Sequence, residues 1–384
     1  MRVLYLIGGS GRLYGSEMVA LNLLKQLSDR VDFIVITSCY GDINKYCEKN
    51  KIENYVVNTS FYVYKKEENK VVDFFKHKYR LINAEFKMIC AVKKIGKIID
   101  FNTVDIIHSN LSRDLLGAKL SSIYKVPHIW YIQEMYKSHY QLSFLKKNQL
   151  DYMNDHSQQF IAISNTVAND WINNGILKEK VTTVYNGIEV KKIQIAKHNN
   201  NKVKLVMLGE VCEAKGQYHI IKAIARLNQK DRNNIQFDIF GNGQNGYLEE
   251  ITALINENNL QEIVKLKGYS DNMADLLQEY DIGINNSRGE GFGLSTAEFM
   301  CAGLCVMCAD RGANVELVKN NINGIIFQYG NINDIAFQLS ELMNNKQKLV
   351  QLGYTASEEA RTTYSSEIMA ENVERVYKSW LRTK

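Results

Sequence analysis

Apolar residues recur along this chain in short β-branched runs, each followed by a longer stretch with helical periodicity. The first series of runs lies at residues 3–8, 32–38, 105–109, 128–132, 159–164 and 181–187. After a polar, asparagine-rich stretch, the series resumes at residues 204–209, 236–241, 263–268, 282–287, 305–310 and 324–327. Strands that alternate with helices form parallel sheets covered on both faces. The pattern predicts an α/β protein with two Rossmann-like domains facing across a cleft.

Length and composition agree with two folded domains. The chain has 384 residues, 45% of them hydrophobic and 23% charged, whereas one domain takes roughly 150 residues. The first apolar run is too short for a signal peptide, and no run reaches the ~20 apolar residues of a membrane span. We therefore expect a cytoplasmic protein whose membrane contact is peripheral. The seven cysteines are expected to be free thiols, and the cluster Cys301, Cys305 and Cys308 to be core residues rather than a metal site.

Positive charge is concentrated in residues 64–97, where ten Lys and Arg stand against four Asp and Glu, a net +6. Apolar side chains are interleaved with these charges at roughly helical spacing: Phe74, Phe75, Leu81, Ile82, Phe86, Ile89 and Val92. This apolar stripe could lie on anionic lipid headgroups. The interpretation we favour is a helix whose stripe faces the core of its own domain.

Both strand series open with strand, glycine, loop, glycine and amphipathic helix. The segments are MRVLYLIGGSGRLYGSEMVALNLLKQL and VKLVMLGEVCEAKGQYHIIKAIARL. Ligands of open parallel sheets bind at such carboxyl ends of strands. Neither loop has the glycine spacing of a dinucleotide fingerprint or a P-loop, so nicotinamide and ATP are weak candidates, and we expect no nucleic-acid partner.

The stretch SRGEGFGLSTAEFMCAG, residues 287–303, combines two carboxylates with a glycine turn between a strand and a helix. Gly291 and Gly293 permit close backbone approach, and the first N–H groups of the helix can hold a phosphate. Glu290 would repel phosphate, so its natural targets are sugar hydroxyls, and Glu298 could accept the paired hydroxyls of a ribose. Together these features outline a site for a sugar nucleotide.

A structural alternative exists for Glu298. Ser295 and Glu298 have the spacing of a capping box, in which the glutamate only satisfies a backbone N–H group. The alternative does not extend to Glu290, which has no evident structural duty.

The same stretch resembles the signature of the retaining glycosyltransferases of family 4, two glutamates separated by seven residues. Further segments follow in that family's order: QFIAISNTVANDWINNGILKEKVTTVYNGIEV, VMLGEVCEAKGQ, FDIFGNGQ, KLKGYSDNMADLLQEYDIGINNS and ADRGANVELVKNNINGIIF. The resemblance implies a GT-B fold with an acceptor-binding domain at 1–188 and a nucleotide-sugar-binding domain at 189–362. It also implies that a C-terminal helix within 363–384 crosses back onto the first domain.

By position, the resemblance assigns roles to individual residues. Glu290 matches the residue on the donor sugar hydroxyls, Glu298 the ribose ligand, and Lys215 the lysine facing the diphosphate; we take Glu290 and Lys215 as the catalytic pair. Gly15 matches a glycine loop that closes over the phosphates. The backbone expected at the diphosphate is that of Gly291, Phe292, Gly293 and Leu294. The sequence contains no Asp-x-Asp, which agrees with a site that needs no metal and no cofactor.

Three positions depart from the family pattern. Glu210 stands where an arginine is common, so Arg288 or Arg12 would have to supply the cation. A tyrosine replaces a second glycine in YGSE. Tyr131 occupies the place of an acceptor-side histidine and is a poor general base with a pKa near ~10. Glu134 is the other acceptor-side candidate, unless it is a solvated loop carboxylate.

These features predict a retaining hexosyltransferase that moves a sugar from a nucleoside-diphosphate donor to a growing cell-surface glycan. The basic segment suggests a lipid-linked acceptor at the inner face of the membrane. Two alternatives stay open: a non-catalytic GT-B subunit of a transferase complex, and an enzyme that epimerises or hydrolyses nucleotide sugars.

Overall fold

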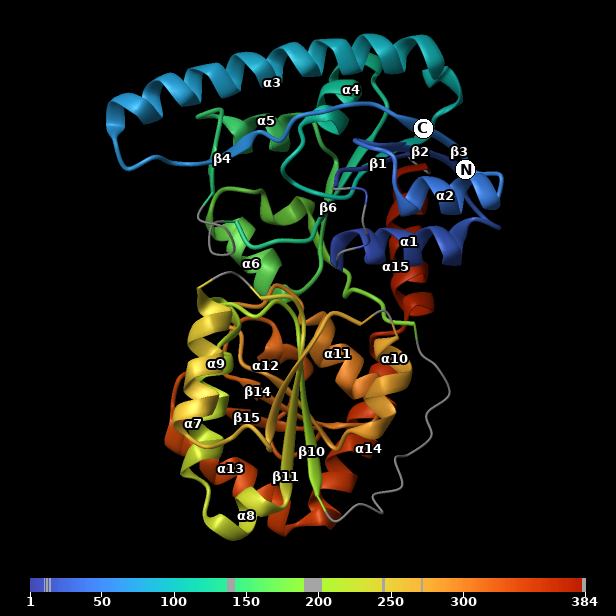
Figure 1. Cartoon of the computed structure of the whole chain (residues 1–384). Helices are drawn as coiled ribbons and strands as arrows, with labels where there is room; N and C mark the ends of the chain where they lie inside the picture. The colour runs from blue at the N-terminus through green and yellow to red at the C-terminus, as the bar shows by residue number, and fades with distance from the viewer. Residues whose placement is uncertain are drawn as a thin grey trace. The chain divides into compact units, whose positions relative to one another are not determined.

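The chain divides into two compact units (Figure 1). Unit 1 comprises Met1–Gly187 and Ser366–Lys384, and unit 2 comprises Ile188–Ser365. The computed structural model describes residues 1–9, 11, 13, 15–136, 142–189, 202–243, 246–270 and 272–381.

Unit 1 is built on a seven-stranded parallel sheet in the order β3-β2-β1-β5-β6-β8-β9. The strands are β1 Arg2–Ile7, β2 Asp32–Thr37, β3 Glu53–Val56, β5 Ile106–Ser109, β6 His128–Ile132, β8 Gln159–Ala162 and β9 Val181–Thr183, with a separate antiparallel pair of β4 Val63–Lys65 and β7 Leu142–Phe144. The α-helices are α1 Gly15–Leu27, α2 Asp42–Lys49, α3 Lys70–Ile98, α4 Leu116–Tyr124, α5 Gln149–Asp155, α6 Asn165–Asn173 and α15 Ser366–Leu381, and the 3-10 turns are η1 Phe101–Thr103 and η2 Lys178–Lys180.

Unit 2 contains a six-stranded parallel sheet in the order β12-β11-β10-β13-β14-β15. The strands are β10 Val203–Leu208, β11 Ile235–Phe240, β12 Val264–Gly268, β13 Ile282–Asn285, β14 Cys305–Ala309 and β15 Ile325–Phe327. The helices are η3 Glu213–Lys215, α7 Gln217–Arg226, α8 Gln229–Asn233, α9 Tyr247–Glu257, α10 Met273–Leu276, η4 Leu277–Glu279, α11 Leu294–Cys301, α12 Asn314–Leu317, α13 Ile332–Asn344 and α14 Lys346–Thr363. The strand order runs one way from β10 and the other way from β13. Right-handed crossovers therefore put α7 and α11 on opposite faces of the sheet.

The prediction of two parallel Rossmann-like sheets is confirmed, and every strand expected from the apolar runs is present within a few residues. These runs are continuous because both faces of a parallel strand are buried. Three strands were missed. The strand β3 reads ENYV and is only half-buried, while β4 and β7 are three residues long, too short to show a period.

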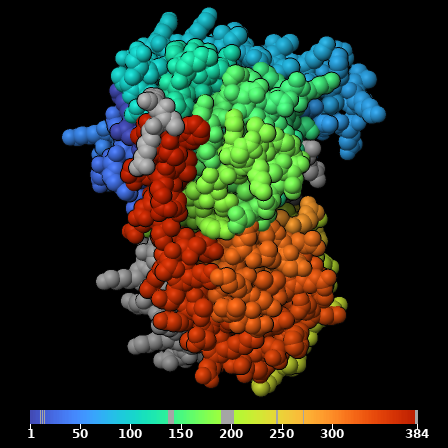
Figure 2. All heavy atoms as spheres, turned by 180° about the vertical axis from the view of Figure 1, so that it is seen from behind, coloured from blue at the N-terminus to red at the C-terminus, as the bar shows by residue number. Residues whose placement is uncertain are grey.

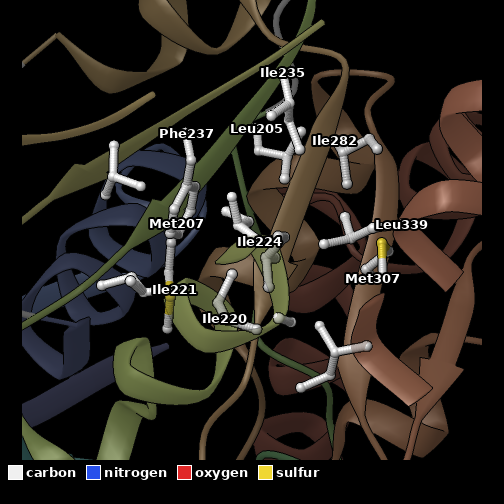
Figure 3. Packing of buried hydrophobic residues seen from close by; sticks show 14 of the residues in the cluster. Leu205, Met207, Ile220, Ile221, Ile224, Ile235, Phe237, Ile282, Met307 and Leu339 are labelled. Atoms are coloured by element: carbon white, nitrogen blue, oxygen red, sulfur yellow. The ribbon is translucent and has the colours of Figure 1, made fainter. Parts of the chain in front are cut away.

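The core of unit 2 lies between its sheet and the flanking helices. Figure 3 shows Leu205 and Met207 of β10 beside Ile220, Ile221 and Ile224 of α7, all of them buried. Phe237, Ile282, Met307 and Leu339 extend the same cluster across the sheet. Cys301, Cys305 and Cys308 are buried free thiols in this unit, as their pattern predicted. Burial raises the pKa of the Cys305 thiol to about 12, so these thiols are unreactive at neutral pH.

The helix α3 overturns the interpretation of its apolar stripe as core-facing. The residues that α3 buries are Ala84, Met88, Ala91 and Ile95. Five of the seven stripe residues are exposed instead, namely Phe74, Phe75, Ile82, Phe86 and Ile89. In Figure 2 the light-blue and cyan atoms of this region lie on the outer surface of unit 1. No helix among the described residues has both the length and the apolarity to cross a membrane.

The C-terminal helix α15 belongs to unit 1, as predicted, and packs against α1. Arg30 Nη1 lies 2.8 Å from Glu374 Oε2. The hydroxyl of Tyr377 is hydrogen-bonded to Nδ1 of His108 on β5, and both side chains are fully buried. Because burial lowers the pKa of His108 to about 3, the imidazole is neutral and its Nδ1 can accept the Tyr377 proton. This hydrogen bond thus joins α15 to β5, the middle strand of the seven-stranded sheet.

We expect the substitution Tyr377→Phe to lower the free energy of unfolding of unit 1 by about 1–3 kcal/mol, because it leaves a buried His108 nitrogen without its partner. Denaturant titration with tryptophan fluorescence measures this directly, since Trp130, Trp171 and Trp380 all belong to unit 1. The matched control is Tyr79→Phe, whose ring is 72% exposed and whose loss should change stability by less than ~0.5 kcal/mol. Equal stability of both variants would contradict the fastening role.

Candidate donor site in unit 2

The predicted donor residues of unit 2 gather where the strand order reverses between β10 and β13. Lys215 follows β10, and Glu290 follows β13. In open α/β sheets the crevice beyond the carboxyl ends of two such strands is the usual ligand site. The topology alone therefore brings the two loops to one edge of the sheet.

Two hydrogen bonds to main-chain carbonyls hold these two loops together. Asn286 Nδ2 donates to the carbonyl of Gly216 at 2.8 Å, and Arg288 N donates to the carbonyl of Ala214 at 2.8 Å. Gly216 has a φ of +72°, and a Cβ there would lie 2.7 Å from the carbonyl oxygen of Asn286. The glycine after Lys215 is required by both its conformation and this close approach.

Lys215 and Glu290 form an ion pair at this edge. Lys215 Nζ lies 3.2 Å from Glu290 Oε2 and 3.5 Å from Oε1. The side chains are 25% and 10% exposed. The resemblance assigned both residues to the donor, but no short pattern indicated an ion pair between them, and the expectation that Glu290 has no structural duty is wrong. The lysine compensates the charge of the carboxylate, so Glu290 is compatible with the phosphate site predicted beside it.

The backbone of Glu290 is fixed by the loop that follows β14. Ala313 N donates to the Glu290 carbonyl at 2.9 Å. Gly312 has a φ of +58°, and a Cβ on it would lie 2.5 Å from Glu290 N. Glycine at 312 therefore lets the chain pass directly beneath Glu290.

The helix α11 begins at Leu294 with Gly293 as its N-cap, at a φ of +92° and with no side-chain cap. Ser295 lies inside the helix, so the capping-box interpretation of Ser295 and Glu298 is wrong. Glu298 is half-buried as a whole residue, and burial of its carboxyl group raises the pKa of that group to about 7. Glu298 does not cap the helix, and its ionised form is disfavoured by burial. A glutamate with such a shifted pKa is a candidate for ligand binding.

A polar network lies under the glycine turn. Asn285 Nδ2 donates to Thr296 Oγ1 at 2.9 Å, and Thr296 Oγ1 donates to Asn314 Oδ1 at 3.0 Å. Several buried polar atoms around it have no hydrogen-bond partner in the described part of the chain: Gln217 Oε1, Asn286 Oδ1, Ser287 Oγ and Asn314 Nδ2. Buried polar groups are normally paired, so these four atoms are unusual features of the loops around the turn. Sequence reasoning missed them because such residues have no distinctive spacing.

The remaining backbone candidates lie in the same turn. Phe292 is buried, with its ring packed edge-on against Tyr364 at 5.8 Å between centroids. Gly291, Gly293 and Leu294 continue the turn into α11. The side chain of Phe292 thus anchors the segment whose backbone is predicted to meet the diphosphate.

Glu210, which departs from the family pattern, and Arg288, the candidate replacement cation, both lie at the surface of unit 2. Glu210 is exposed, and its carbonyl accepts a hydrogen bond from Gln217 Nε2 at 3.0 Å. Arg288 Nη1 lies 3.8 Å from Glu213 Oε1, and both side chains are largely exposed. No group of three or more His, Cys, Asp or Glu side chains in the described ranges is arranged to hold a metal ion.

The acceptor-side candidates belong to unit 1. Tyr131 has no exposed surface, and its hydroxyl donates to Asn186 Oδ1 at 3.0 Å; burial raises the pKa of this phenol further. Contact between Tyr131 and an acceptor stays a prediction and would need a different conformation.

Glu134 is buried. It accepts hydrogen bonds from the backbone N and the hydroxyl of Ser112 and lies 3.6 Å from Arg113 Nε. The alternative of a solvated loop carboxylate is therefore wrong.

Gly15 begins α1 in unit 1, and its role at the phosphates stays a prediction. Arg12 and the tyrosine of YGSE lie outside the described residues. At the ends of β1 and β2, a small hollow is lined by Gly8, Gly9, Glu17 and Ser38, among others. Glu17 is 7% exposed and was not singled out from the sequence.

Comparison with known proteins assigns the chain to a family. Residues 14–192 match Glycosyltransferase Family 4 and residues 189–359 match Glycosyl transferases group 1. The chain therefore belongs to the group 1/family 4 glycosyltransferases with the GT-B fold. The family named by the resemblance is confirmed, whereas the roles of the two glutamates and retention of configuration stay predictions.

The individual relatives share a third or less of their aligned residues with this chain. The poly(ribitol-phosphate) alpha-N-acetylglucosaminyltransferase of Staphylococcus aureus is 31% identical over 149 residues, which is 38% of this chain and 30% of that protein. An uncharacterized glycosyltransferase of Methanocaldococcus jannaschii is 23% identical over 312 residues, 74% of this chain and 78% of that protein. The crystal structure of Anabaena Alr3699/HepE in complex with UDP-glucose superposes with a TM-score of 0.77 at 20% identity, covering 99% and 100% of the two chains. The match thus spans less than a third of the S. aureus relative.

The close approach of Gly312 to the backbone of Glu290 can be tested with Gly312→Ala. We expect this variant to lose about 1–3 kcal/mol more stability than Gly268→Ala, because a Cβ at 312 collides with the Glu290 backbone. Gly268 is a matched control: its φ is +70° but its Cβ would meet nothing within 4 Å. Differential scanning calorimetry gives both values, and equal losses would show that Gly312 does not support Glu290.

The raised pKa of Glu298 predicts a pH-dependent stability. Between its ordinary value of 4.5 and about 7, the native state holds a proton that the unfolded state releases, so stability falls as pH rises and levels off above ~7. Glu298→Gln lacks this slope and should melt at a higher temperature than wild type at pH 8. Glu341→Gln, at an exposed position, serves as control. A Glu298→Gln protein less stable than wild type at pH 8 would refute the buried-charge assignment.

Proposed function

We propose that this chain is a retaining, metal-independent hexosyltransferase that moves a sugar from a UDP-sugar to a growing, lipid-linked cell-surface glycan. The single observation that carries this proposal is the Lys215–Glu290 ion pair at the β10/β13 edge, in a chain of this glycosyltransferase family.

The ion pair supplies both functions that a sugar nucleotide requires. Lys215 turns from Glu290 to the diphosphate, and the N-terminal turn of α11 adds a favourable dipole. Glu290 then accepts hydrogen bonds from the sugar hydroxyls, while Glu298 accepts those of the ribose. Positive charge from Lys215 and α11 stabilises the departing diphosphate, the task a metal ion performs in other sites.

Retention follows if the acceptor attacks the face from which the diphosphate leaves. The bond between the anomeric carbon and the diphosphate oxygen breaks, and a bond from the acceptor oxygen forms on the same face. The acceptor proton passes to the departing diphosphate, so no protein base is needed. Burial raises the pKa of Tyr131, so its phenol stays protonated at neutral pH and cannot act as a base. The route is compatible with this because the diphosphate takes the acceptor proton.

The identity of the substrates rests on relatives. HepE was crystallised with UDP-glucose, which supports a UDP-sugar donor, and the S. aureus relative is named for transfer to poly(ribitol-phosphate), which supports a polymeric cell-surface acceptor. A lipid-linked acceptor would place the protein at the inner face of the membrane.

Turnover of a donor panel tests the proposal. The pure protein is incubated with UDP-, GDP- and dTDP-sugars, with and without lipid extract, and release of nucleoside diphosphate is followed. We expect acceptor-dependent release from a UDP-sugar, and a loss of about 100-fold or more in Glu290→Ala and Lys215→Ala. Glu262→Ala, whose side chain is 95% exposed in the same unit, should retain full activity.

The other outcomes identify the alternatives. Release of free sugar without an acceptor would indicate a hydrolase, and a change of sugar configuration without release an epimerase. Failure to bind any donor would leave the non-catalytic subunit.

A further inference from the structure

The outward face of α3 is an apolar surface that unit 1 leaves uncovered. Six large side chains on it are between 53% and 72% exposed: Val71, Phe75, Tyr79, Ile82, Phe86 and Ile89. Their spacing of three or four residues puts them on one face of the helix. We call this set the α3 outer face. Contiguous exposed apolar patches of this kind mark interaction sites.

The outer face lies opposite the side that packs on unit 1. The buried residues Ala84, Met88, Ala91 and Ile95 follow the same helical spacing, about half a turn away from the exposed set. The exposed side chains thus point away from unit 1, while the buried ones face it. Folding of unit 1 does not account for this distribution.

Positive charge accompanies the apolar face. The helix carries eight Lys and Arg against two Asp and Glu, a net +6. Of the two acids, Glu85 is paired with Lys146 at 2.7 Å. Lys93 and Lys97 continue the spacing of the outer face beyond Ile89, and both are exposed. The face is therefore apolar over its first two thirds and cationic at its end.

We propose that the α3 outer face docks on an anionic lipid bilayer, with the helix lying in the plane of the interface. Its aromatic and aliphatic side chains enter the boundary between headgroups and acyl chains, and the flanking lysines contact the anionic headgroups. The helix is about 44 Å long, from 29 residues at ~1.5 Å each. This length gives a line of contacts rather than a single anchor.

Charge complementarity favours lipid over a second copy of this chain. Two copies meeting through the outer face would bring two helices of net +6 together, which is unfavourable at ordinary ionic strength. An anionic surface reverses the sign of this interaction. The docking proposal concerns a surface of unit 1 and is independent of the donor chemistry in unit 2.

Vesicle flotation with the full chain tests the proposal. Wild type is mixed with pure phosphatidylcholine vesicles, or with vesicles in which about a third of the lipid is anionic phosphatidylglycerol, at low and high salt. We expect binding to the anionic vesicles that salt weakens. The variant Phe75→Gln/Ile82→Gln/Phe86→Gln should bind at least about tenfold more weakly, and Lys93→Glu/Lys97→Glu should lose about tenfold or more on anionic vesicles.

The matched control is Phe337→Gln, which removes a 61% exposed phenylalanine from α13 of unit 2 and should leave binding unchanged. Circular dichroism and tryptophan fluorescence confirm that each variant is folded. Wild type that ignores anionic vesicles, or a triple variant that binds as well as wild type, would overturn the proposal. So would a concentration-dependent dimer that the triple variant abolishes, because the occupant would then be a second copy. Transfer of sugar to a soluble acceptor is measured for every variant as well. It tests the proposed function of unit 2 separately from membrane binding.

Discussion

The reversal of strand order between β10 and β13 is the constraint on which the candidate site depends. It brings two loops from distant parts of the sequence to one edge of the sheet, where Lys215 and Glu290 neutralise each other. An ion pair with little exposure is tolerated only while both partners are present, because a lone buried charge is costly. The same pair joins the two loops and, under the proposed function, provides one cation for a diphosphate and one carboxylate for sugar hydroxyls.

Glycine and amide groups make this arrangement possible. Gly216 and Gly312 allow backbones to approach where any side chain would collide, and the network of Asn285, Thr296 and Asn314 fixes the turn before α11. Nearby buried polar atoms lack hydrogen-bond partners in the described ranges, which is uncommon for buried polar groups. The loops that contain the predicted donor residues are thus also the ones that these contacts hold in place. In unit 1, the Tyr377–His108 hydrogen bond joins the C-terminal helix to the sheet, and the α3 outer face lies on the surface.

Sequence reasoning recovered the sheets because buried parallel strands are continuous apolar runs, and it missed β3, β4 and β7 because these are short or half-exposed. It placed Glu290 before the glycine turn and Glu298 in the helix that follows, but an ion pair between residues 75 positions apart, Lys215–Glu290, depends on topology and leaves no local pattern. The capping box failed because Gly293, with its positive φ, starts the helix two residues earlier than Ser295 would allow. The stripe of α3 was assigned to the core because periodicity reports that a helix has an apolar face, not what covers it.

The most direct test of the central claim is calorimetric titration of UDP and a UDP-sugar into wild type and Glu290→Gln. If Lys215 must leave Glu290 to meet the diphosphate, removing the carboxylate charge frees the lysine. UDP should then bind Glu290→Gln more tightly than wild type, while the UDP-sugar should lose most of its advantage over UDP because its hydroxyls exchange a charged acceptor for a weaker neutral one. Unchanged affinities for both ligands would contradict a donor site built on this ion pair, since neither residue would then contact the donor.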